Sequence, residues 1–388
     1  MQETKQITVL YVVNQISVVG GIEKIVLDKA DWLIKHGYRV YICTTEEQVT
    51  DLLFFSHNPQ IYFCHNLLHT LRCEKVDFVQ FTRPMFRLMA RCRLLHPHIK
   101  YGVELHACYE VFNYGEDYFR TFEKKQDLSF KKMCDRLFPY LETIVVSARN
   151  DGIRKWGYDN VRCIYNFTNL QFNANIQPRQ KLVVAVGRYV YQKGFEYLIQ
   201  AWQRVAEVCP DWQLQIWGDG EQREYLQQLI EERGVQQQVK LMGYVTQMTQ
   251  LFSHVSLFVM SSRYEGFGIV LVDAQRCGVP TISFNLPSGP SDIINDGVDG
   301  FLCRYLDESD LADKIIKVLQ DDNLREELSR AAIQNSMRFT PENIMPQWDE
   351  LFRQSLSTPY KQPIKGYCNS LFVEFNYLKN EIKAWLKK

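Results

Sequence analysis

The sequence predicts an α/β protein composed of two doubly wound domains, each with a parallel sheet covered by helices on both faces. Three observations lead to this prediction. The chain has 388 residues, which is more than one domain usually contains. Short apolar runs, typical of strands buried on both faces of a parallel sheet, alternate with amphipathic stretches. The alternation occurs in both halves of the chain, with a polar segment between them.

The first half opens with a strand–helix–strand pattern. Residues 7–13 form a nearly continuous apolar run, and the turn after them ends in Gly20 and Gly21. An amphipathic helix is expected next, ended by Gly37. Strands are expected at residues 7–13, 38–43, 76–81, 101–105 and 142–147. We therefore place an N-terminal domain at residues 1–170.

The second half repeats this organisation after a mostly polar linker at residues 169–179. Strands are expected at residues 182–186, 214–217, 239–242, 256–260 and 281–284, with helices at 195–205, 223–232 and 268–277. Each expected helix has an apolar stripe that can cover one face of a sheet. We therefore place a second domain at residues 171–340.

Residues 341–388 are expected to form C-terminal helices. Pro341 favours a helix start, and the first helix is expected to pack back towards the N-terminal domain through a stripe that includes Trp348. An amphipathic helix with several lysines is expected at residues 371–388. Together with the basic segment 83–100, it suggests peripheral contact with an anionic membrane. The alternative for that segment is an ordinary amphipathic helix that packs its apolar face inward.

Composition excludes some classes of protein and indicates a compartment. Apolar residues make up 46% and charged residues 23%, as in an ordinary globular protein with a sizeable core. The formal net charge is zero, with 45 basic and 45 acidic residues, which argues against a nucleic-acid partner. The 11 cysteines are scattered without a C-x-x-C pair, as expected for reduced thiols. No charged and then apolar leader and no spanning apolar run is visible. We therefore expect a cytoplasmic protein, with any membrane contact on the cytoplasmic face.

The most informative stretch is residues 261–274, where a strand is expected to end in a polar, glycine-rich turn before a helix. Gly266 and Gly268 flank an aromatic residue and would let backbone N–H groups approach a ligand closely. The helix N-terminus behind them offers unpaired donors and a partial positive charge. Glu265 and Asp273 place a carboxylate before the turn and another about two helical turns after it. Backbone amides can donate to phosphate oxygens, and carboxylates can accept hydrogen bonds from hydroxyls. This combination suits a sugar nucleotide.

A second candidate is the loop of residues 187–194, which connects a buried strand to a helix. Ligands bind at the carboxyl ends of strands in such sheets. The loop starts with Gly187, and Arg188 and Lys193 could both reach one diphosphate, as a fork and as a point charge. The alternative is two surface cations on a loop.

Other turns at strand ends are weaker candidates. Gly243 and Tyr244 follow another strand of the same layer and are expected to frame a flat base. Residues 218–221 are interpreted mainly as a strand-to-helix connection. Residues 289–292 either contact the donor or form a turn with an Asp near a helix start.

The N-terminal domain offers fewer candidates. A diphosphate could approach the amides of Gly20 and Gly21, although the dinucleotide-binding pattern G-x-G-x-x-G is absent. His106 follows the strand at 101–105 and has either a substrate role or a structural one. His65 and His69 have i, i+4 spacing, but no carboxylate or Cys pattern accompanies them, and no D-x-D motif is present. We therefore expect no metal and no cofactor, with phosphate charge balanced by basic side chains and helix ends.

The order of these motifs resembles the family 4 glycosyltransferases. The resemblance is carried by Gly187-Arg188 to Lys193-Gly194 and by Glu265-Gly-Phe-Gly268 continuing to Gly278-Val-Pro280, and it extends from Gly20-Gly21 to about Trp348. It implies the GT-B fold, in which two Rossmann-like domains face each other across a cleft. The second domain would bind a nucleotide-diphosphate sugar, and the first would present the acceptor.

The resemblance also implies roles for individual residues. Arg188 and Lys193 would bind the diphosphate. Glu265 would contact the transferred sugar or its phosphate, and the amides of Phe267 and Gly268 would contact sugar hydroxyls.

Two further positions carry implied roles. Asp273 would bind the ribose hydroxyls, where the family usually has Glu, so the shorter side chain puts donor affinity in question. His106 would lie near the sugar and the acceptor. Residues 289–292 resemble a variant of polysaccharide and lipid-linked oligosaccharide enzymes, which favours a uridine diphosphate donor.

The implied function is retaining, metal-free transfer of a hexose or N-acetylhexosamine. The acceptor would be a glycan or a lipid-linked molecule in surface polysaccharide or glycoconjugate synthesis. The leaving diphosphate itself would take the acceptor proton, so catalysis would be mostly electrostatic stabilisation and positioning. The alternatives are a nucleotide-sugar epimerase or phosphorylase of the same fold, and a sugar-nucleotide-binding protein without turnover.

Overall fold

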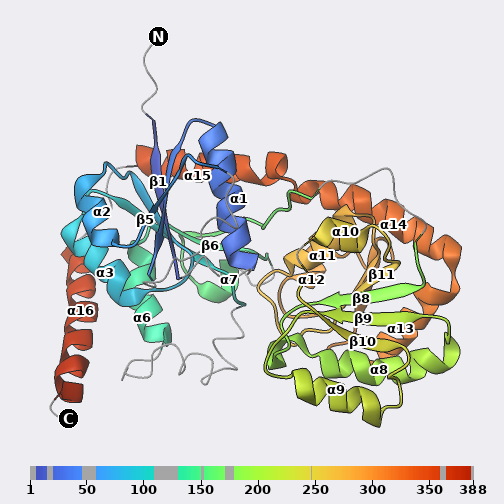
Figure 1. Cartoon of the computed structure of the whole chain (residues 1–388). Helices are drawn as coiled ribbons and strands as arrows, with labels where there is room; N and C mark the ends of the chain where they lie inside the picture. Colours follow the sequence, from blue (N-terminus) through green and yellow to red (C-terminus); the bar gives the residue numbers. More distant parts are fainter. Residues whose placement is uncertain are drawn as a thin grey trace. The chain divides into compact units, whose positions relative to one another are not determined.

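The chain divides into two compact α/β units (Figure 1). The computed structural model describes residues 6–14, 21–45, 58–108, 130–149, 153–170, 179–245, 247–358 and 364–385, without the side chains of residues 130, 153, 154, 364 and 382–385. Unit 1 comprises residues 1–147, 151–165 and 344–388, and unit 2 comprises residues 148–150 and 166–343. The change of unit at residue 166 precedes the polar segment, of which residues 171–178 lie outside the described residues.

Unit 1 is built on a parallel sheet with seven strands in the described residues, in the order β3-β2-β1-β4-β5-β6-β7. The strands are β1 Thr8–Val13, β2 Arg39–Thr44, β3 Ile61–Cys64, β4 Phe78–Phe81, β5 Lys100–Leu105, β6 Thr143–Val146 and β7 Val161–Cys163. The strands β1, β4, β5 and β6 are buried along their whole length because helices cover both faces. This burial explains the mostly apolar sequences of β1 and β6. Strands β4 and β5 carry buried polar residues as well, namely Gln80, Lys100 and Glu104.

The two outer strands, β3 and β7, were not predicted from the sequence. Each has only its first residue buried, and the others are half-buried or exposed. An edge strand that is partly exposed needs neither a continuous apolar run nor strict alternation, so its sequence carries a weak signal.

The helices of unit 1 come from both ends of the chain. They are α1 Gly21–Lys35, α2 Leu67–Cys73, α3 Phe86–Leu95, α6 Phe130–Leu137, α7 Ile153–Trp156, α15 Pro341–Ser357, which enters unit 1 at residue 344, and α16 Ile364–Trp385. Helix α15 packs on unit 1 through Tyr38, whose hydroxyl donates to Asp349 Oδ1 at 2.5 Å. The rings of Phe78 and Phe352 also meet, with centroids 5.0 Å apart.

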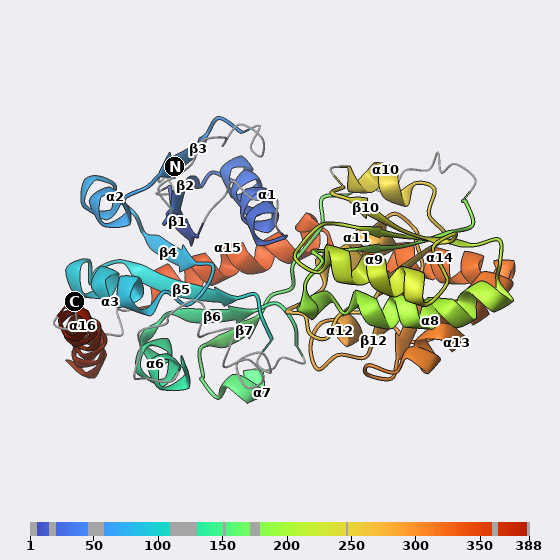
Figure 2. The ribbon, with the colours of Figure 1, turned by 60° about the horizontal axis from the view of Figure 1, so that its bottom comes forward.

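Helix α16 lies side by side with α3 and α6 (Figure 2). It begins at residue 364, whereas the sequence predicted a start at residue 371. Gly366 is buried in its first turn, and a Cβ atom there would lie 2.9 Å from the ring of Tyr140. The glycine is used for close packing, so the residue that weakens helix propensity in the sequence lies inside the helix.

The arginines of the basic segment 83–100 are engaged within unit 1. Arg91 Nε donates to Glu374 Oε1 of α16 at 2.9 Å, and Arg87 pairs with both Glu374 and Glu381. These ion pairs hold α16 against α3. Among the described residues, no helix combines the length and the apolar character that crossing a bilayer requires.

Unit 2 is built on a second parallel sheet, with six strands in the described residues, in the order β10-β9-β8-β11-β12-β13. The strands are β8 Leu182–Val186, β9 Gln213–Trp217, β10 Val239–Gly243, β11 Leu257–Met260, β12 Thr281–Phe284 and β13 Gly300–Cys303. The helices are α8 Phe195–Val208, α9 Arg223–Glu232, α10 Met248–Phe252, α11 Ile269–Arg276, α12 Pro290–Ile293, α13 Glu308–Gln320 and α14 Asp322–Ser336.

Strand β13 and the helices α13 and α14 were not predicted, although the two helices carry clear start signals. Asp307 caps α13 by accepting the N–H of Asp310 at 2.9 Å. Asp321 caps α14 by accepting the N–H of Leu324 at 3.0 Å. An Asp at the N-cap before an apolar-periodic stretch is a sequence signal that could have identified both helices.

Each sheet reverses its strand order at its first strand, β1 in unit 1 and β8 in unit 2. The loops that leave the carboxyl ends of the strands on either side of such a point diverge, and ligands bind there in open α/β sheets. In unit 2, the two strands concerned are β8 and β11. The loops after them are residues 187–194 and 261–268, the two strongest sequence candidates.

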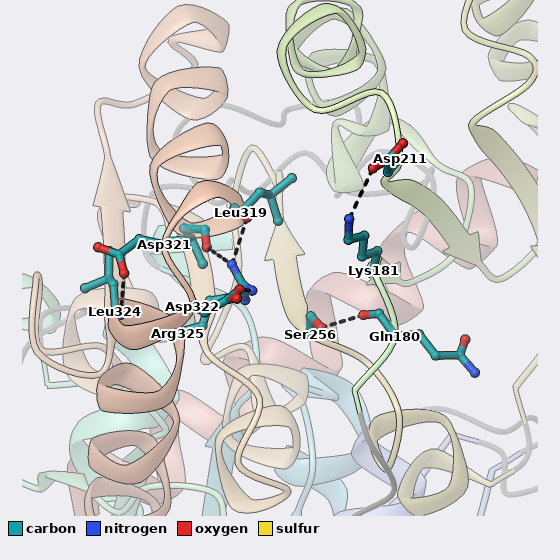
Figure 3. A network of polar contacts seen from close by, with 10 residues as sticks. Gln180, Lys181, Asp211, Ser256, Leu319, Asp321, Asp322, Leu324 and Arg325 are labelled. Atoms are coloured by element: carbon teal, nitrogen blue, oxygen red, sulfur yellow. Dashed lines mark hydrogen bonds and ion pairs between the residues drawn. The ribbon is translucent and has the colours of Figure 1, made fainter.

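Polar contacts join neighbouring segments at the amino-terminal edge of the unit 2 sheet (Figure 3). Lys181 Nζ lies 3.1 Å from Asp211 Oδ2, just before β8 and β9. Arg325 Nη1 donates to the carbonyls of Val318 and Leu319 at 2.7 and 2.8 Å, so it satisfies the last turn of α13. These contacts lie at the opposite end of the strands from the candidate loops.

Candidate functional site

The loop after β8 brings Lys193 to the carboxyl end of the sheet. Lys193 ends a short 3₁₀ turn at Tyr191–Lys193, and Gly194 follows in the left-handed region with φ 57° before α8. The lysine side chain folds over Gly187, where an added Cβ would lie 3.0 Å from Lys193 Cε. Glycine at position 187 therefore leaves room for the lysine stem. The side chain ends at the loop that follows β11.

Lys193 and Glu265 form an ion pair, although they are 72 residues apart in the sequence. Lys193 Nζ lies 2.6 Å from Glu265 Oε1. The hydroxyl of Ser262, which is buried, donates to the same carboxylate oxygen at 2.7 Å. The structure thus brings the cation of one candidate loop and the carboxylate of the other into direct contact, with the carboxylate largely buried.

Residues 288 and 289 pack against the glycine turn that follows Glu265. Phe267 is buried and meets the ring of Phe339 edge-on at 5.5 Å. A Cβ on Gly289 would lie 2.3 Å from the carbonyl oxygen of Phe267, so only glycine permits this approach. The hydroxyl of Ser288 also donates to the carbonyl of Gly266 at 3.1 Å. Residues 289–292 therefore serve at least to hold the turn.

Helix α11 starts directly behind this turn. Gly268 precedes it with φ 92°, and both Gly266 and Gly268 are half-buried. Asp273 lies inside α11 with its side chain buried. Its expected role towards ribose hydroxyls stays a prediction.

The remaining candidates of unit 2 are more exposed. The side chain of Arg188 is exposed and has no hydrogen bond or ion pair with another described residue, while its backbone carbonyl accepts the N–H of Val190 at 2.8 Å. Gly243 ends β10, and the carbonyl of this residue accepts the N–H of Gly218 at 2.7 Å. Tyr244 follows it and is 73% exposed. The ring of Tyr244 is therefore available to a flat ligand.

The 218–221 turn connects β9 to α9, and it also contacts the loop of residues 187–194, which we call the cationic loop. The N–H of Tyr189 donates to the carbonyl of Asp219 at 2.9 Å, and the N–H of Gly187 donates to Trp217. Gly218 has φ 144°, and a Cβ there would lie 1.8 Å from the carbonyl oxygen of Gly187. The backbones of the two loops are therefore in direct contact.

We expect Gly218→Ala to destabilise unit 2 more than Gly234→Ala does, by about 1–3 kcal/mol of unfolding free energy, the range for overpacking. Gly234 also has a positive φ, of 69°, but no atom lies within 4 Å of the position of its Cβ. Both variants therefore suffer backbone strain, and only the first adds a collision with Gly187. Urea unfolding followed by circular dichroism measures the difference, and equal losses would show that the loop contact contributes nothing.

In unit 1, His106 lies next to a pair of buried charged side chains, Lys29 and Glu104. His106 Nε2 lies 3.2 Å from Glu104 Oε2 of β5. Lys29 Nζ of α1 lies 2.6 Å from the same oxygen, and both side chains are at most 3% exposed. The Lys29 ammonium also lies 3.9 Å from the ring centroid of Trp348 in α15, an arrangement that favours a cation–π interaction. Gly21 begins α1 and is exposed, and Gly20 lies outside the described residues.

The charge states of this buried pair follow from opposing effects. Burial lowers the pKa of Lys29, and the neighbouring Glu104 acts in the opposite direction. Burial alone would raise the pKa of Glu104, but Lys29 and His106 hold that pKa below its ordinary value. The lowered pKa favours the ionised form of Glu104, and the Lys29 amine lies in direct contact with that carboxylate.

The segment that contains the two candidate loops of unit 2 is similar to known proteins. Residues 166–335 match the model of the family Glycosyl transferases group 1. Among curated relatives, the amylovoran biosynthesis glycosyltransferase AmsD of Erwinia amylovora is 31% identical over 47% of this chain and 50% of its own length. The poly(ribitol-phosphate) alpha-N-acetylglucosaminyltransferase of Staphylococcus aureus is 28% identical over 53% of this chain and 42% of its own length. The chain thus spans half or less of these two relatives.

Solved structures extend the likeness beyond the group 1 segment. A sucrose-phosphate synthase of Thermosynechococcus elongatus has a TM-score of 0.77 at 18% identity, covering 90% of this chain and 99% of that one. Anabaena HepE, solved with UDP and glucose, has a TM-score of 0.74 at 18% identity, covering 90% and 100%. At these identities the likeness concerns the fold. It confirms the prediction of two Rossmann-like doubly wound domains of the GT-B class.

A second connection joins the two candidate loops of unit 2, and we did not predict it from the sequence. Arg263 pairs with Glu196 of α8, and its guanidinium lies 3.8 Å from the ring centroid of Tyr191. The backbone N–H of Arg263 donates to the carbonyl of Gln192 at 2.8 Å, and the side chain of Gln192 donates through Nε2 to the carbonyl of Tyr264 at 3.0 Å. These bonds join the cationic loop to the glycine turn. The only signal in the sequence was a charged residue beside the Glu-Gly-Phe-Gly motif.

Sequence reasoning also missed Lys29 and Glu104. Each interrupts an otherwise apolar pattern at a position expected to be buried, Lys29 on the stripe of α1 and Glu104 within β5. A charged residue at such a position is a sign of a buried partner. In the described ranges, no three His, Cys, Asp or Glu side chains are grouped so that they could hold a metal ion.

Proposed function

We propose that this protein is a glycosyltransferase that moves a hexose or N-acetylhexosamine from a nucleotide-diphosphate sugar to a glycan or lipid-linked acceptor. The observation that carries the proposal is the assembly of Lys193, Glu265 and the Gly266–Gly268 turn at the carboxyl edge of the unit 2 sheet. A cation, a carboxylate and glycine amides are the groups that a sugar diphosphate requires. They lie within the segment that matches the group 1 model.

The relatives support a role in surface polysaccharide or glycoconjugate synthesis and a UDP-linked donor. AmsD is named for amylovoran biosynthesis, and the Staphylococcus aureus relative is named for adding N-acetylglucosamine to poly(ribitol-phosphate). The Anabaena HepE structure contains UDP and glucose. These are properties of those proteins, and we extend them to this chain as part of the proposal.

In the proposed complex, Lys193 and Arg188 bind the diphosphate, each by charge-assisted hydrogen bonds of about 1.5–3 kcal/mol. Glu265 and the amides of the glycine turn contact the sugar, and Asp273 contacts the ribose. The ion pair of Lys193 with Glu265 supports this assignment because it fixes the ammonium beside the turn before any ligand arrives. Positioned charge of this kind stabilises a leaving diphosphate without reorganisation.

The proposed reaction proceeds with retention of the anomeric configuration. The bond between the anomeric carbon and the leaving diphosphate oxygen breaks, and the acceptor oxygen bonds to the same face of that carbon. The leaving oxygen takes the acceptor proton, so no side chain has to act as a strong base. Proton NMR of the anomeric signal of the product tests the stereochemistry.

The activity is tested by incubating the protein with UDP-hexoses and with GDP-hexoses, each with and without glycan acceptors. The expected result is release of UDP that depends on the acceptor. Interconversion of the hexose while it stays on the nucleotide would instead identify an epimerase. Donor binding seen by calorimetry, without turnover on any acceptor, would favour a binding protein.

We expect the transfer rate to be unchanged, within about twofold, when a chelator removes divalent ions, because the proposed site balances phosphate charge with side chains and amides. The measurement is UDP release in EDTA, compared with the same reaction in magnesium. A loss of activity that a divalent ion restores would overturn the metal-free proposal while leaving the transferase proposal intact.

The cysteines support a cytoplasmic location as part of this proposal. All eleven are free thiols. Dispersed, unpaired cysteines are typical of proteins in a reducing compartment.

A further inference from the structure

The outward face of α16 carries a continuous apolar stripe. Tyr367, Leu371, Phe375 and Leu378 recur at spacings of four, four and three residues, which places them on one face of the helix. Their exposed fractions range from 42% for Leu378 to 67% for Phe375. The opposite face packs on unit 1 through Val373, which is fully buried. Adjacent exposed residues of this size usually mark an interaction surface.

Acidic and basic residues of α16 lie on opposite sides of this apolar stripe. Glu374 and Glu381 lie on one flank, and both are paired with the arginines of α3 described above. Lys365 and Lys379 are exposed on the other flank. Both carboxylates are therefore paired with arginines, although the side chain of Glu381 is 54% exposed, while Lys365 and Lys379 face solvent beside the apolar stripe. The result is an apolar face with a cationic border.

The neighbouring helix α6 extends the cationic border. Lys132 is exposed on α6, which packs beside α16 (Figure 2), and the exposed Lys131 is paired with Asp135 of the same helix at 3.4 Å. Arg136 of α6 lies with its guanidinium 3.6 Å from the ring centroid of Phe372, a further exposed aromatic residue of α16. Aromatic and leucine side chains framed by basic residues are typical of helices that lie in a membrane interface.

We propose that the outward face of α16 docks on an anionic membrane surface, with the helix axis in the plane of the interface. The stripe would enter the boundary between headgroups and acyl chains, and the lysines would meet lipid phosphates. This inference goes beyond glycosyl transfer and does not rest on it.

The test is flotation of the full-length protein with vesicles of phosphatidylcholine alone and of phosphatidylcholine with phosphatidylglycerol in equal parts. The wild type is expected to float with the anionic vesicles, with binding weakened by high salt. The double variant Leu371→Ser/Phe375→Ser is expected to lose about tenfold or more of this binding. Lys365→Glu/Lys379→Glu is expected to reduce binding to the anionic vesicles selectively. The matched control is Tyr225→Ser on α9, which removes an aromatic residue of unit 2 that is 48% exposed.

The readout is independent of catalysis, so failure of this proposal and failure of the proposed function are distinguishable. Because the replaced side chains are exposed, the variants are expected to keep the wild-type melting temperature and circular dichroism spectrum. Absence of wild-type flotation, or equal flotation of the stripe variant and the Tyr225→Ser control, would overturn the proposal. So would a dimer in sedimentation velocity that the stripe variant abolishes, since the face would then bind a second copy.

Discussion

Replacing Lys193 with alanine is expected to lower kcat for glycosyl transfer about 10²–10³-fold, the usual effect of removing one positioned donor from a developing oxyanion. The ammonium lies at the carboxyl end of the unit 2 sheet, 2.6 Å from Glu265 Oε1. Without it, the leaving diphosphate of the proposed reaction would lose a fixed positive charge, and the largely buried Glu265 carboxylate would lose its counter-charge. The measurement is the initial rate of UDP release with donor and acceptor at saturation.

The matched control is Lys181→Ala. Lys181 also pairs with a carboxylate, that of Asp211, but at the amino-terminal edge of the same sheet and with both side chains well exposed (Figure 3). Exposed ion pairs contribute about 0–1 kcal/mol, so we expect neither turnover nor stability to change much. A folded Lys193→Ala protein with nearly normal kcat would refute the proposed role of Lys193.

Replacing Lys29 with methionine is expected to lower the unfolding free energy of unit 1 by about 3–5 kcal/mol, because an ionised Glu104 would stay buried without its partner. Lys29 and Glu104 are both almost fully buried and lie 2.6 Å apart. The lost ammonium also ends the contact with the ring of Trp348. Urea unfolding, followed by tryptophan fluorescence and circular dichroism, gives the change.

Two companion variants make this prediction specific to the buried charge. Lys24→Met removes an exposed lysine from the same helix, where it pairs with Asp28, and is expected to change stability by less than about 1 kcal/mol. The double variant Lys29→Met/Glu104→Leu is expected to recover much of the loss, because replacing both charges leaves no unpaired ion. If Lys29→Met were as stable as Lys24→Met, the pair would not hold α1 to the sheet.

The central strands of both sheets could be predicted because burial on two faces forces a run of apolar residues, as in β1 and β8. The edge strands β3, β7 and β13 could not be recognised in the same way. They are short, and β3 and β7 are partly exposed, so they need fewer apolar residues. Sequence patterns report burial more directly than they report strand pairing.

The candidate site shows the same division. The two loops of unit 2 were found because glycines and charges at strand ends have a local explanation. The ion pair between Lys193 and Glu265 joins residues 72 positions apart, and that between Lys29 and Glu104 joins residues 75 apart. No local pattern encodes such partners, because the crossover connections of a parallel sheet decide which loops meet.

The opposed edges of the unit 2 sheet also bear on how this protein can be altered. The amino-terminal edge carries side-chain contacts such as those of Ser256 and Arg325, and the carboxyl edge is formed by glycine turns whose backbones touch one another. Changes at distant, unconnected positions tend to have additive effects. Stability can therefore be engineered through side chains at the amino-terminal edge independently of the carboxyl-edge turns, whereas a change in one of those turns has to be made together with changes in its neighbours.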